Sequence, residues 1–340
     1  MTEQQWAEER VRLEVLAAQQ SHDGDRDAER GTRQELITFL ASGNEFKAAL
    51  KEAYAVLALT VEPEERAEAA YAVALVGAKV SMEPVLTRSR LEDAYEEADM
   101  AESARMRAKS AMQLGAFEMG QKRAVVASER FAQAIHAFAE QGDEESVFDA
   151  YRFRTFALQM AGSVHDAFAC LTEAMELAKR RGRDDALLSF RLDLHQLADH
   201  PLLADEIARE PLHQLAKDAE EAGHPTLAAQ VHLTEASEHI RKRRQAEAIA
   251  CAERAREIAL TGPSPMVYLV SCLLIAEAEE QRHNRIGCLT ALFTCQASLG
   301  DLLGERARVP VLQVIDSLEP RWGPAVFAEA MTGYRAQFRG

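Results

Sequence analysis

Three side chains of metal-binding types lie close together in the second half of the sequence. His232, Glu235 and His239 are separated by three and four residues, so a helix would place all three on one side. Zinc needs three or four well-placed ligands. The spacing also differs from the His-Glu-x-x-His metalloprotease motif, whose histidines lie one turn apart. We therefore interpret these residues as structural or groove-facing, and we expect no metal and no cofactor.

Thiol chemistry is a second candidate, because the chain has five cysteines. Their odd number and their positions in expected helices favour reduced thiols in a cytoplasmic protein. No neighbouring histidine or carboxylate pattern marks one thiol as a nucleophile. Glycine-rich phosphate loops, nucleophile elbows and paired-cysteine zinc motifs are also missing from the sequence. We expect a protein that is not an enzyme. The cysteines are Cys170, Cys251, Cys272, Cys288 and Cys295.

An acidic run near the N-terminus resembles the start of a calcium-binding loop. Asp23, Asp25 and Asp27 alternate along the chain. Such a loop needs glycine at its sixth position and glutamate at its twelfth, but Ala28 and Gln34 occupy those positions. We interpret the run as part of a solvated linker between two helices.

Net charge excludes one class of partner. The chain carries 55 acidic and 39 basic residues, a formal net charge of −16. Binding to nucleic acid needs clustered lysine and arginine, so we expect no nucleic-acid partner. The longest apolar run, 267–276, is too short to span a bilayer, and the first ten residues lack the apolar segment of a signal peptide. We expect no membrane insertion.

Two basic runs, 179–183 and 241–244, have two interpretations. Cations near a helix C-terminus are stabilised by the helix dipole, which explains both runs without a partner. Alternatively, the runs form a docking patch for an acidic partner. Charge is unevenly distributed, since residues 62–102 contain eleven acids and four bases, whereas 151–183 contain six bases and three acids. Such asymmetry would orient a partner or join two copies of the chain.

The elements that position these side chains follow from an internal repeat. Five glycines recur at intervals of 40, 41, 39 and 38 residues, and such a period indicates a repeat architecture. We expect each glycine to end a helix in a left-handed turn, and acidic residues or proline to open the next helix. The glycines are Gly142, Gly182, Gly223, Gly262 and Gly300.

Small and apolar residues recur with the same period upstream of the glycines. Three columns lie at offsets of zero, four and seven, which are neighbours on one helical face. Forty residues hold two helices of about 16 residues and two short turns. The first column is Ala127, Ala167, Ala208, Ala248 and Cys288; the second is Phe131, Leu171, Leu212, Ala252 and Leu292; the third is Ala134, Ala174, Leu215, Ala255 and Cys295.

The chain resembles the tetratricopeptide-repeat (TPR-like) superfamily, in its variant with repeats of about 40 residues. In that family a small residue, a large residue four later and a small residue seven later mark the second helix of each pair. Ala127, Phe131 and Ala134 match this pattern, and Gly162 lies at the family's turn between the two helices of a pair. The resemblance covers residues 103–305 and implies a protein-binding role.

We therefore predict an all-α fold, a right-handed α-solenoid of stacked antiparallel helical hairpins with a C-terminal capping helix. We expect residues 1–102 to form an N-terminal helical region, either degenerate repeats or a separate bundle. Residues 103–305 would form the repeat array, and 306–340 a capping segment. Hairpins must stack because one hairpin cannot bury its own apolar face.

The expected function is that of a bacterial scaffold or adaptor that binds a peptide or helix of a partner protein. The resemblance implies that the first helix of each pair lines a concave groove. A second copy of the chain is another candidate partner. The alternative is a TPR-type regulatory sensor, in which residues 1–102 form a module controlled by a ligand on the repeats. Groove candidates are Asp149, Arg152, Phe156, Gln159, Asp193, Gln230, Ser237 and Glu277.

Overall fold

The structure, a computed structural model, describes residues 2–203, 209–262 and 264–337. Within those ranges it has seventeen α-helices, one short 3-10 helix and no strand, which confirms the all-α prediction. The chain divides into two compact units, residues 1–174 and 175–340, and the boundary lies inside α9 (Val164–Arg181).

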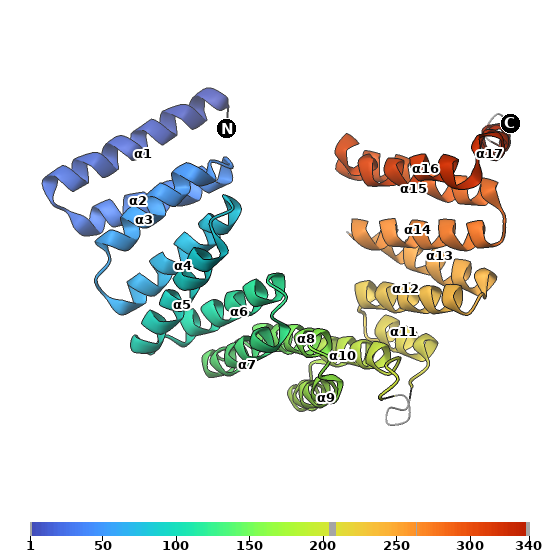
Figure 1. Cartoon of the computed structure of the whole chain (residues 1–340), viewed down its shortest axis with the longest axis horizontal. Helices are drawn as coiled ribbons and strands as arrows, with labels where there is room; N and C mark the ends of the chain where they lie inside the picture. The colour runs from blue at the N-terminus through green and yellow to red at the C-terminus, as the bar shows by residue number, and fades with distance from the viewer. Residues whose placement is uncertain (1, 204–208, 263, 338–340) are drawn as a thin grey trace. The chain divides into compact units, whose positions relative to one another are not determined.

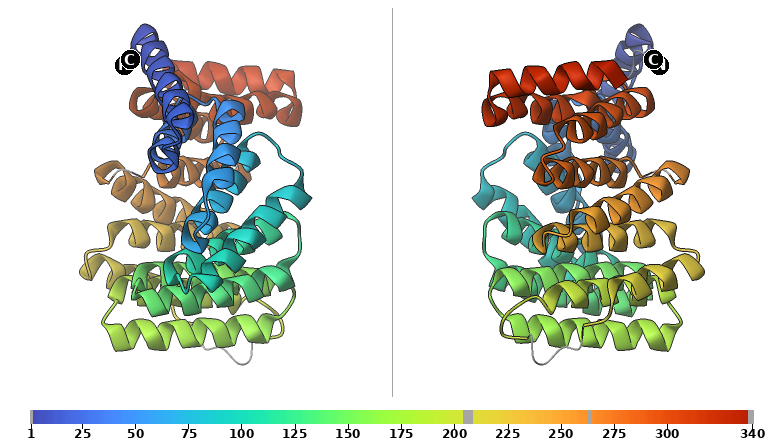
Figure 2. Two further views of the ribbon diagram at one scale, coloured as in Figure 1. Left: turned by 90° about the vertical axis from the view of Figure 1, so that its left-hand side faces the viewer. Right: turned by 90° about the vertical axis from the view of Figure 1, so that its right-hand side faces the viewer.

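In the N-terminal unit each helix from α1 to α8 packs against the next one along the chain (Figures 1 and 2). Short connections make these neighbours antiparallel, so they form consecutive helical hairpins. The helices are α1 (Glu3–Asp23), α2 (Arg26–Ser42), α3 (Phe46–Leu59), α4 (Pro63–Lys79), α5 (Pro84–Met100), α6 (Ala104–Gly120), α7 (Ala124–Gln141) and α8 (Glu144–Met160).

The C-terminal unit continues the same arrangement of helices in series. Here α12 contacts α10 and α14 as well as its sequence neighbours, so the first helices of successive hairpins touch. Figure 2 shows the yellow to red helices of this unit in stacked layers. They are α10 (Asp184–Leu197), α11 (Leu212–Glu221), α12 (Pro225–Arg241), α13 (Gln245–Thr261), α14 (Pro265–Gln281), α15 (Arg285–Leu303), the 3-10 helix η1 (Glu305–Arg308), α16 (Val309–Trp322) and α17 (Pro324–Gln337).

Helix starts agree with the local chemistry of the sequence. Asp143 caps α8, because its carboxylate accepts a hydrogen bond from the Ser146 N–H at 3.2 Å. Pro225 and Pro265 are the first residues of α12 and α14, where the missing N–H leaves no hydrogen bond unmade. These starts confirm the predicted boundaries.

Three of the five predicted glycine turns are present, and two are wrong. The structure confirms a left-handed backbone at Gly142, Gly182 and Gly223, with φ between 65° and 77°. Gly262, in contrast, is extended at φ −122°. It precedes Pro263 in the sequence, and a residue before proline is driven toward extended backbone. Gly162, at the turn that the family resemblance implies, is also left-handed, with φ 77°.

Gly300 also departs from the prediction, because it lies inside α15. That helix continues to Leu303 and ends at Gly304, whose φ is 85°. A Cβ at position 300 would lie 1.8 Å from Nε of Arg308, so this side chain packs against a glycine that makes no turn. Asp301 therefore belongs to α15 and does not open a new helix.

The linker predicted around Asp23, Asp25 and Asp27 is only two residues long. Helix α1 extends to Asp23 and α2 begins at Arg26, so only Gly24 and Asp25 separate them. Gly24 turns the chain with φ 76°, and the Asp25 carboxylate accepts from the Ala28 N–H at 3.1 Å. The acidic run thus ends one helix and caps the next.

The three columns of repeated residues form helix–helix contacts, as predicted. Every described member is buried, and most have almost no exposed surface. Small side chains here let the helices of neighbouring hairpins approach closely. One column position, Ala208, lies outside the described residues.

The predicted C-terminal capping segment consists of two helices. Both α16 and α17 pack on α15. The Tyr334 ring of α17 stacks on Phe293 of α15 with centroids 4.7 Å apart, and Ala330 is buried. Residues after α15 therefore cover apolar surface of the last hairpin, which would otherwise face water.

Candidate functional site

An exposed apolar strip runs along helix α8. One side of this helix is buried through Val147, Tyr151 and Leu158. On the exposed part, Phe153, Phe156 and Met160 are 48, 52 and 64 % exposed. Intervals of three and four residues place them along the same side of the helix. We call these three residues the α8 strip.

Four of the predicted groove residues lie on the same helix as this strip. Asp149, Arg152 and Phe156 are exposed, and Gln159 is half-buried. Their spacing of three, four and three residues keeps them on one side of α8. The structure therefore brings this part of the predicted set together, with both charges and an amide flanking an aromatic ring.

Sequence reasoning missed two members of the strip, Phe153 and Met160. Phe153 stacks on the buried Phe131 of α7, with ring centroids 5.6 Å apart and planes 23° apart. The stacking contact holds the Phe153 ring in place, although about half of its surface is exposed. Large apolar residues three and four positions apart were the available signal, but a core-facing helix side gives the same pattern.

The other predicted groove residues are spread over three helices of the C-terminal unit. Asp193 is half-buried on α10, and Gln230 is exposed on α12. The Ser237 hydroxyl donates to the Leu233 carbonyl oxygen of its own helix at 2.9 Å. Glu277 is exposed on α14. These four residues do not form one cluster with each other.

Two of them line hollows. Gln230 borders a hollow of about 290 Å³ with Asp185, Ser189 and His224. Asp185 is held there by two hydrogen bonds from Arg183, at 3.0 and 2.8 Å, and this guanidinium lowers the pKa of Asp185 to about 2.

Glu277 borders a second hollow, of about 400 Å³, between α14, α15 and α16. Arg321 and Glu280 lie at its edge and form an ion pair. The indole Nε1 of Trp322 also donates to Glu280, at 2.6 Å. Leu292, Val314 and Leu318 supply apolar wall.

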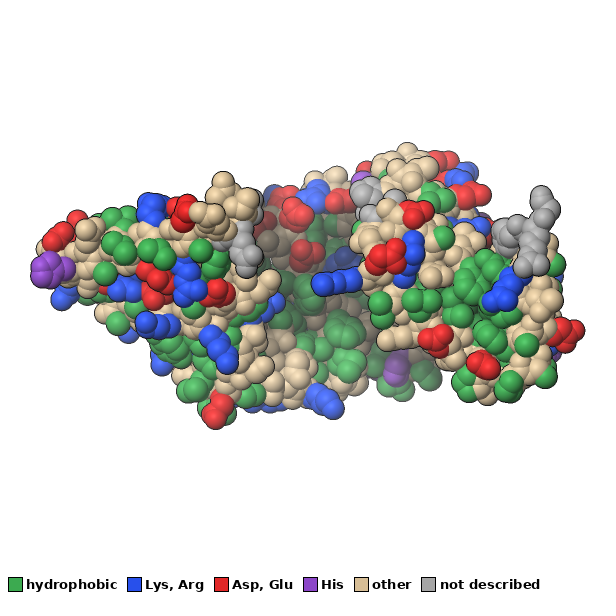
Figure 3. Space-filling model, turned by 90° about the horizontal axis from the view of Figure 1, so that it is seen from above, with side chains coloured by type: hydrophobic (Ala, Val, Ile, Leu, Met, Phe, Trp, Pro, Cys, Tyr) green, Lys and Arg blue, Asp and Glu red, His purple; other side chains and the backbone are tan. Residues whose placement is uncertain are grey.

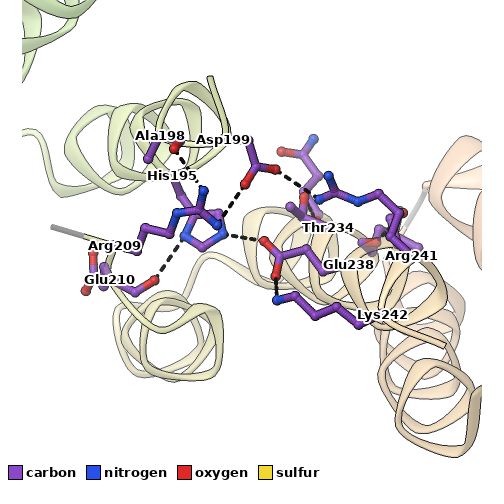
Figure 4. A network of polar contacts seen from close by, with 12 residues as sticks. His195, Ala198, Asp199, Arg209, Glu210, Thr234, Glu238, Arg241 and Lys242 are labelled. Carbon is purple, nitrogen blue, oxygen red and sulfur yellow. Dashed lines mark hydrogen bonds and ion pairs between the residues drawn. The ribbon is translucent and has the colours of Figure 1, made fainter. Parts of the chain in front are cut away.

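A polar network joins α10 to α12 in the C-terminal unit (Figure 4). The buried His195 ring lies between two acceptors, with Nε2 2.6 Å from Glu238 Oε1 and Nδ1 3.0 Å from the Glu210 carbonyl oxygen. Both bonds form together only when each ring nitrogen carries a proton. Lys242 donates to the other oxygen of Glu238 at 2.6 Å.

The same network sets the charge of Glu238. Burial raises the pKa of this carboxyl, but hydrogen bonds from Lys242 and His195 outweigh burial and lower the pKa to about 2. Asp199 adds an outer pair, accepting from Arg209 at 2.9 Å and Arg241 at 3.0 Å. Arg209 and Arg241 therefore share the Asp199 carboxylate, and Lys242 pairs with Glu238.

The basic run 241–244 is largely used within the fold. Arg241 and Lys242 pair with Asp199 and Glu238, as just described. Arg243 occupies the left-handed turn after α12, at φ 57°. Pairing within the fold therefore accounts for Arg241 and Lys242 without a partner protein. On the face seen in Figure 3, acidic and basic side chains lie interspersed.

A side-chain cluster lies between α12 and α13, and sequence reasoning singled out two of its members, Glu235 and His239, but missed the third, Cys251. Glu235 and His239 of α12 meet Cys251 of α13, and one ligand atom from each lies within 4.8 Å of the other two. The nearby His232 imidazole lowers the pKa of Glu235 against the effect of burial. Burial, together with the Glu235 charge, raises the pKa of Cys251 to about 12.

Comparison with known proteins gives structural matches only. No family model matches the sequence, and no curated protein matches it. BtubC from P. vanneervenii is 14 % identical, with 76 % of this chain and 91 % of BtubC covered and a TM-score of 0.47. The Rap protein complexed with competence and sporulation factor is 12 % identical, with 95 and 99 % covered and a TM-score of 0.45. The apo form of the quorum sensor NprR from B. thuringiensis is 11 % identical, with 93 and 97 % covered and a TM-score of 0.34.

Consecutive helical hairpins, with small residues buried where their helices meet, decide the fold class within each unit. The architecture is TPR-like. No helix within the described ranges is both long enough and apolar enough to cross a membrane.

Proposed function

We propose that this chain is a non-enzymatic scaffold that binds an extended or helical segment of a partner protein along α8. The observation that carries the proposal is the α8 strip, whose three large apolar side chains are about half exposed or more. Burying such side chains contributes roughly 25 cal/mol per Å² of apolar surface removed from water. Aromatic residues in a buried position supply most of the binding energy at many interfaces.

Polar residues beside the α8 strip would set the direction in which the partner segment lies along the helix. Asp149 and Arg152 lie one turn apart on α8 and carry opposite charges, and Gln159 follows near the other end of the strip. Charges at the rim of an interface set orientation and association rate more than affinity. The partner segment would therefore present apolar anchors along one side, with an acidic residue near Arg152.

Packing of the first hundred residues supports the scaffold over the regulatory sensor. Helix α5 packs on α6, and α4 also contacts α6. Residues 1–174 form one compact unit, with no break near residue 102. A sensor would need an effector module that moves relative to the repeats, whereas continuous packing suits a stack of repeats that holds a partner.

The test combines partner identification with variants of the strip. The tagged full chain would be purified from its native cell, and co-eluting proteins would be identified by mass spectrometry. Binding of the identified partner would then be measured for Phe156→Asp, Met160→Ser and Arg152→Glu. The control is Val125→Asp, because Val125 on α7 is also an exposed apolar residue, at 58 %.

We expect Phe156→Asp and Met160→Ser to weaken binding at least about tenfold, since each removes an anchor. Arg152→Glu should weaken binding chiefly by slowing association, since it reverses an orienting charge. The control should bind like the unmodified chain, and circular dichroism should be the same for all. Undiminished binding by both Phe156→Asp and Arg152→Glu would reject α8 as the site.

A further inference from the structure

Three different metal-ligating side chains meet on facing surfaces of the α12–α13 hairpin. Glu235 and His239 are four residues apart on α12, which places them one turn apart on one side of that helix. Cys251 lies on α13, which packs against α12. A carboxylate oxygen, an imidazole nitrogen and the thiol sulfur all lie within 4.8 Å of one another, and all three residues are half-buried.

The hairpin holds this arrangement in place. Arg243 adopts the left-handed backbone that reverses the chain between the two helices, and α13 starts two residues later. Ala248, Ala252 and Ala255 of α13 are buried, so the helices approach closely around the cluster. Ligands on regular helices are held more firmly than ligands on loops.

Two imidazole nitrogens near the cluster are buried without a hydrogen-bond partner among the described residues. They are Nδ1 of His239 and Nδ1 of His232. Buried polar atoms are nearly always satisfied, so each such atom calls for an explanation. A metal ion bound through Nδ1 of His239 would supply the partner that this atom lacks.

We propose that Glu235, His239 and Cys251 bind a zinc ion that links α12 to α13. Zinc takes thiolate, imidazole and carboxylate ligands in tetrahedral sites, with three protein ligands and one water as a common set. Thiolate disfavours calcium and magnesium, which prefer oxygen ligands. Two anionic ligands balance the charge of Zn²⁺. The ion takes the place of the thiol proton of Cys251, which passes to solvent.

Small side-chain movements are enough to form the site. Ligand atoms of a tetrahedral zinc site lie roughly 3.5 Å apart, given metal–ligand lengths of about 2.0–2.3 Å. In the structure the ligand atoms of Glu235, His239 and Cys251 lie up to 4.8 Å apart. Rotation of one side chain about its χ angles is enough to close the difference of about 1 Å. The backbone of the hairpin can stay where it is.

His232 is a positioning residue for the same site. Its Nδ1 lies 3.7 Å from Glu235 Oε2, and its Nε2 lies 3.5 Å from Glu220 Oε1. The ring therefore lies between two carboxylates and limits where Glu235 can turn. Residues that orient a ligand in this way commonly alter metal affinity by about 10- to 100-fold when they are replaced.

The chain contains its own comparison for this site. Cys170 on α9 and Cys251 on α13 each follow the first small-residue column by three positions. The positions that match Glu235 and His239, 81 residues earlier, hold Arg154 and Leu158. A cation and an alkyl chain cannot bind zinc. The same repeat position therefore lacks the site in one hairpin and has it in another.

The experiment measures metal binding by the full chain, first freed of metal with a chelator. Zinc content would be determined by mass spectrometry after dialysis, and affinity by competition with a chromophoric chelator. Cobalt(II) would serve as a spectroscopic probe, because a thiolate ligand gives a near-ultraviolet charge-transfer band and tetrahedral sites give strong visible bands. Variants are Cys251→Ser, His239→Gln and Glu235→Gln, with Cys170→Ser as the matched control.

We expect one zinc ion per chain and a thiolate band with cobalt. Cys251→Ser should remove the band, and each of the three ligand variants should weaken zinc binding at least about tenfold. Cys170→Ser should behave like the unmodified chain. Zinc should raise the melting temperature of these two proteins and not that of the ligand variants. Circular dichroism identifies any variant that fails to fold, and the near-isosteric Glu235→Gln then remains the deciding one. Absence of zinc binding, or equal binding by the folded ligand variants, would overturn the proposal.

Discussion

The ring of Phe131 on α7 lies directly against the backbone of Gly115 on α6. A Cβ built at position 115 would come 2.5 Å from Cε1 of this ring and 2.7 Å from Cδ1. Phe131 is fully buried, packed with Ala127 and Ala157, so it has no space into which to move. The smallest residue thus sets the distance between the two helices of this hairpin.

Replacing Gly115 with alanine should destabilise the N-terminal unit. Alanine favours a helix over glycine by about 1 kcal/mol, whereas overpacking a filled core costs about 1–3 kcal/mol. The overlap with a fixed ring places Gly115→Ala toward the upper end, so we expect a net loss of about 1–2 kcal/mol. Chemical denaturation followed by circular dichroism measures it.

Gly120 on the same helix is the matched control. A Cβ there would meet nothing within 4 Å. Gly120→Ala should therefore keep or slightly raise stability, through helix propensity alone. Equal stability of the two alanine variants would show that the helices can move apart at Gly115.

Between residues 102 and 182, left-handed turns recur every twenty residues, twice as often as the glycines that reveal the repeat. Non-glycine residues adopt this backbone at the turns between, including Lys122 with φ 59° and Arg243 with φ 57°. A side chain in this conformation costs roughly 1–2 kcal/mol. From the third hairpin on, the unbroken series is Glu102, Lys122, Gly142, Gly162 and Gly182.

Exchanging residue types at two of these turns should shift stability in opposite directions. Lys122 is exposed, so Lys122→Gly relieves the backbone and should stabilise by about 0.5–1 kcal/mol after the entropy of glycine is subtracted. Gly142→Ala should destabilise by about 0.5–1 kcal/mol after the same subtraction, although its Cβ would meet no atom within 4 Å. Thermal melts of the two variants check both signs. A stabilised Gly142→Ala would contradict this account.

Acid should weaken the C-terminal unit through Glu238. Its folded pKa, about 2, lies below its ordinary value of 4.5. A lowered carboxyl pKa stabilises the fold above pH 4.5, and this stabilisation is lost as pH falls from about 4.5 to 2. Glu238→Gln should therefore be less stable than the unmodified chain at pH 7, with the difference shrinking across that window.

Denaturation at several pH values measures this difference. Glu329→Gln is the control, because Glu329 is an exposed carboxylate on α17. Its stability should follow that of the unmodified chain at every pH. A deficit of Glu238→Gln that persists unchanged at pH 2 would mean that lost packing, rather than lost charge, causes it.

Prediction from sequence worked where the signal was local. Ala127 and Phe131 share one helix, so their spacing alone indicates a common buried side. It failed at Gly300, which looked like a helix end but lies inside α15, where the Arg308 side chain of η1 packs against it. Phe156 was placed on a side of α8 that the structure leaves exposed, while Phe153 and Met160 were not distinguished from core residues.

The sequence by itself determined the helices, the hairpins that connect them and the residues buried between them, because helix propensity, turn chemistry and apolar periodicity act within about forty residues. Only the tertiary structure decided which side chains meet between elements. Glu238 bonds to His195 at 2.6 Å, 43 residues earlier, and Cys251 approaches Glu235 and His239 across a hairpin. Such meetings depend on how far each helix is rotated against its neighbour, and that rotation comes from the packing of all their side chains together.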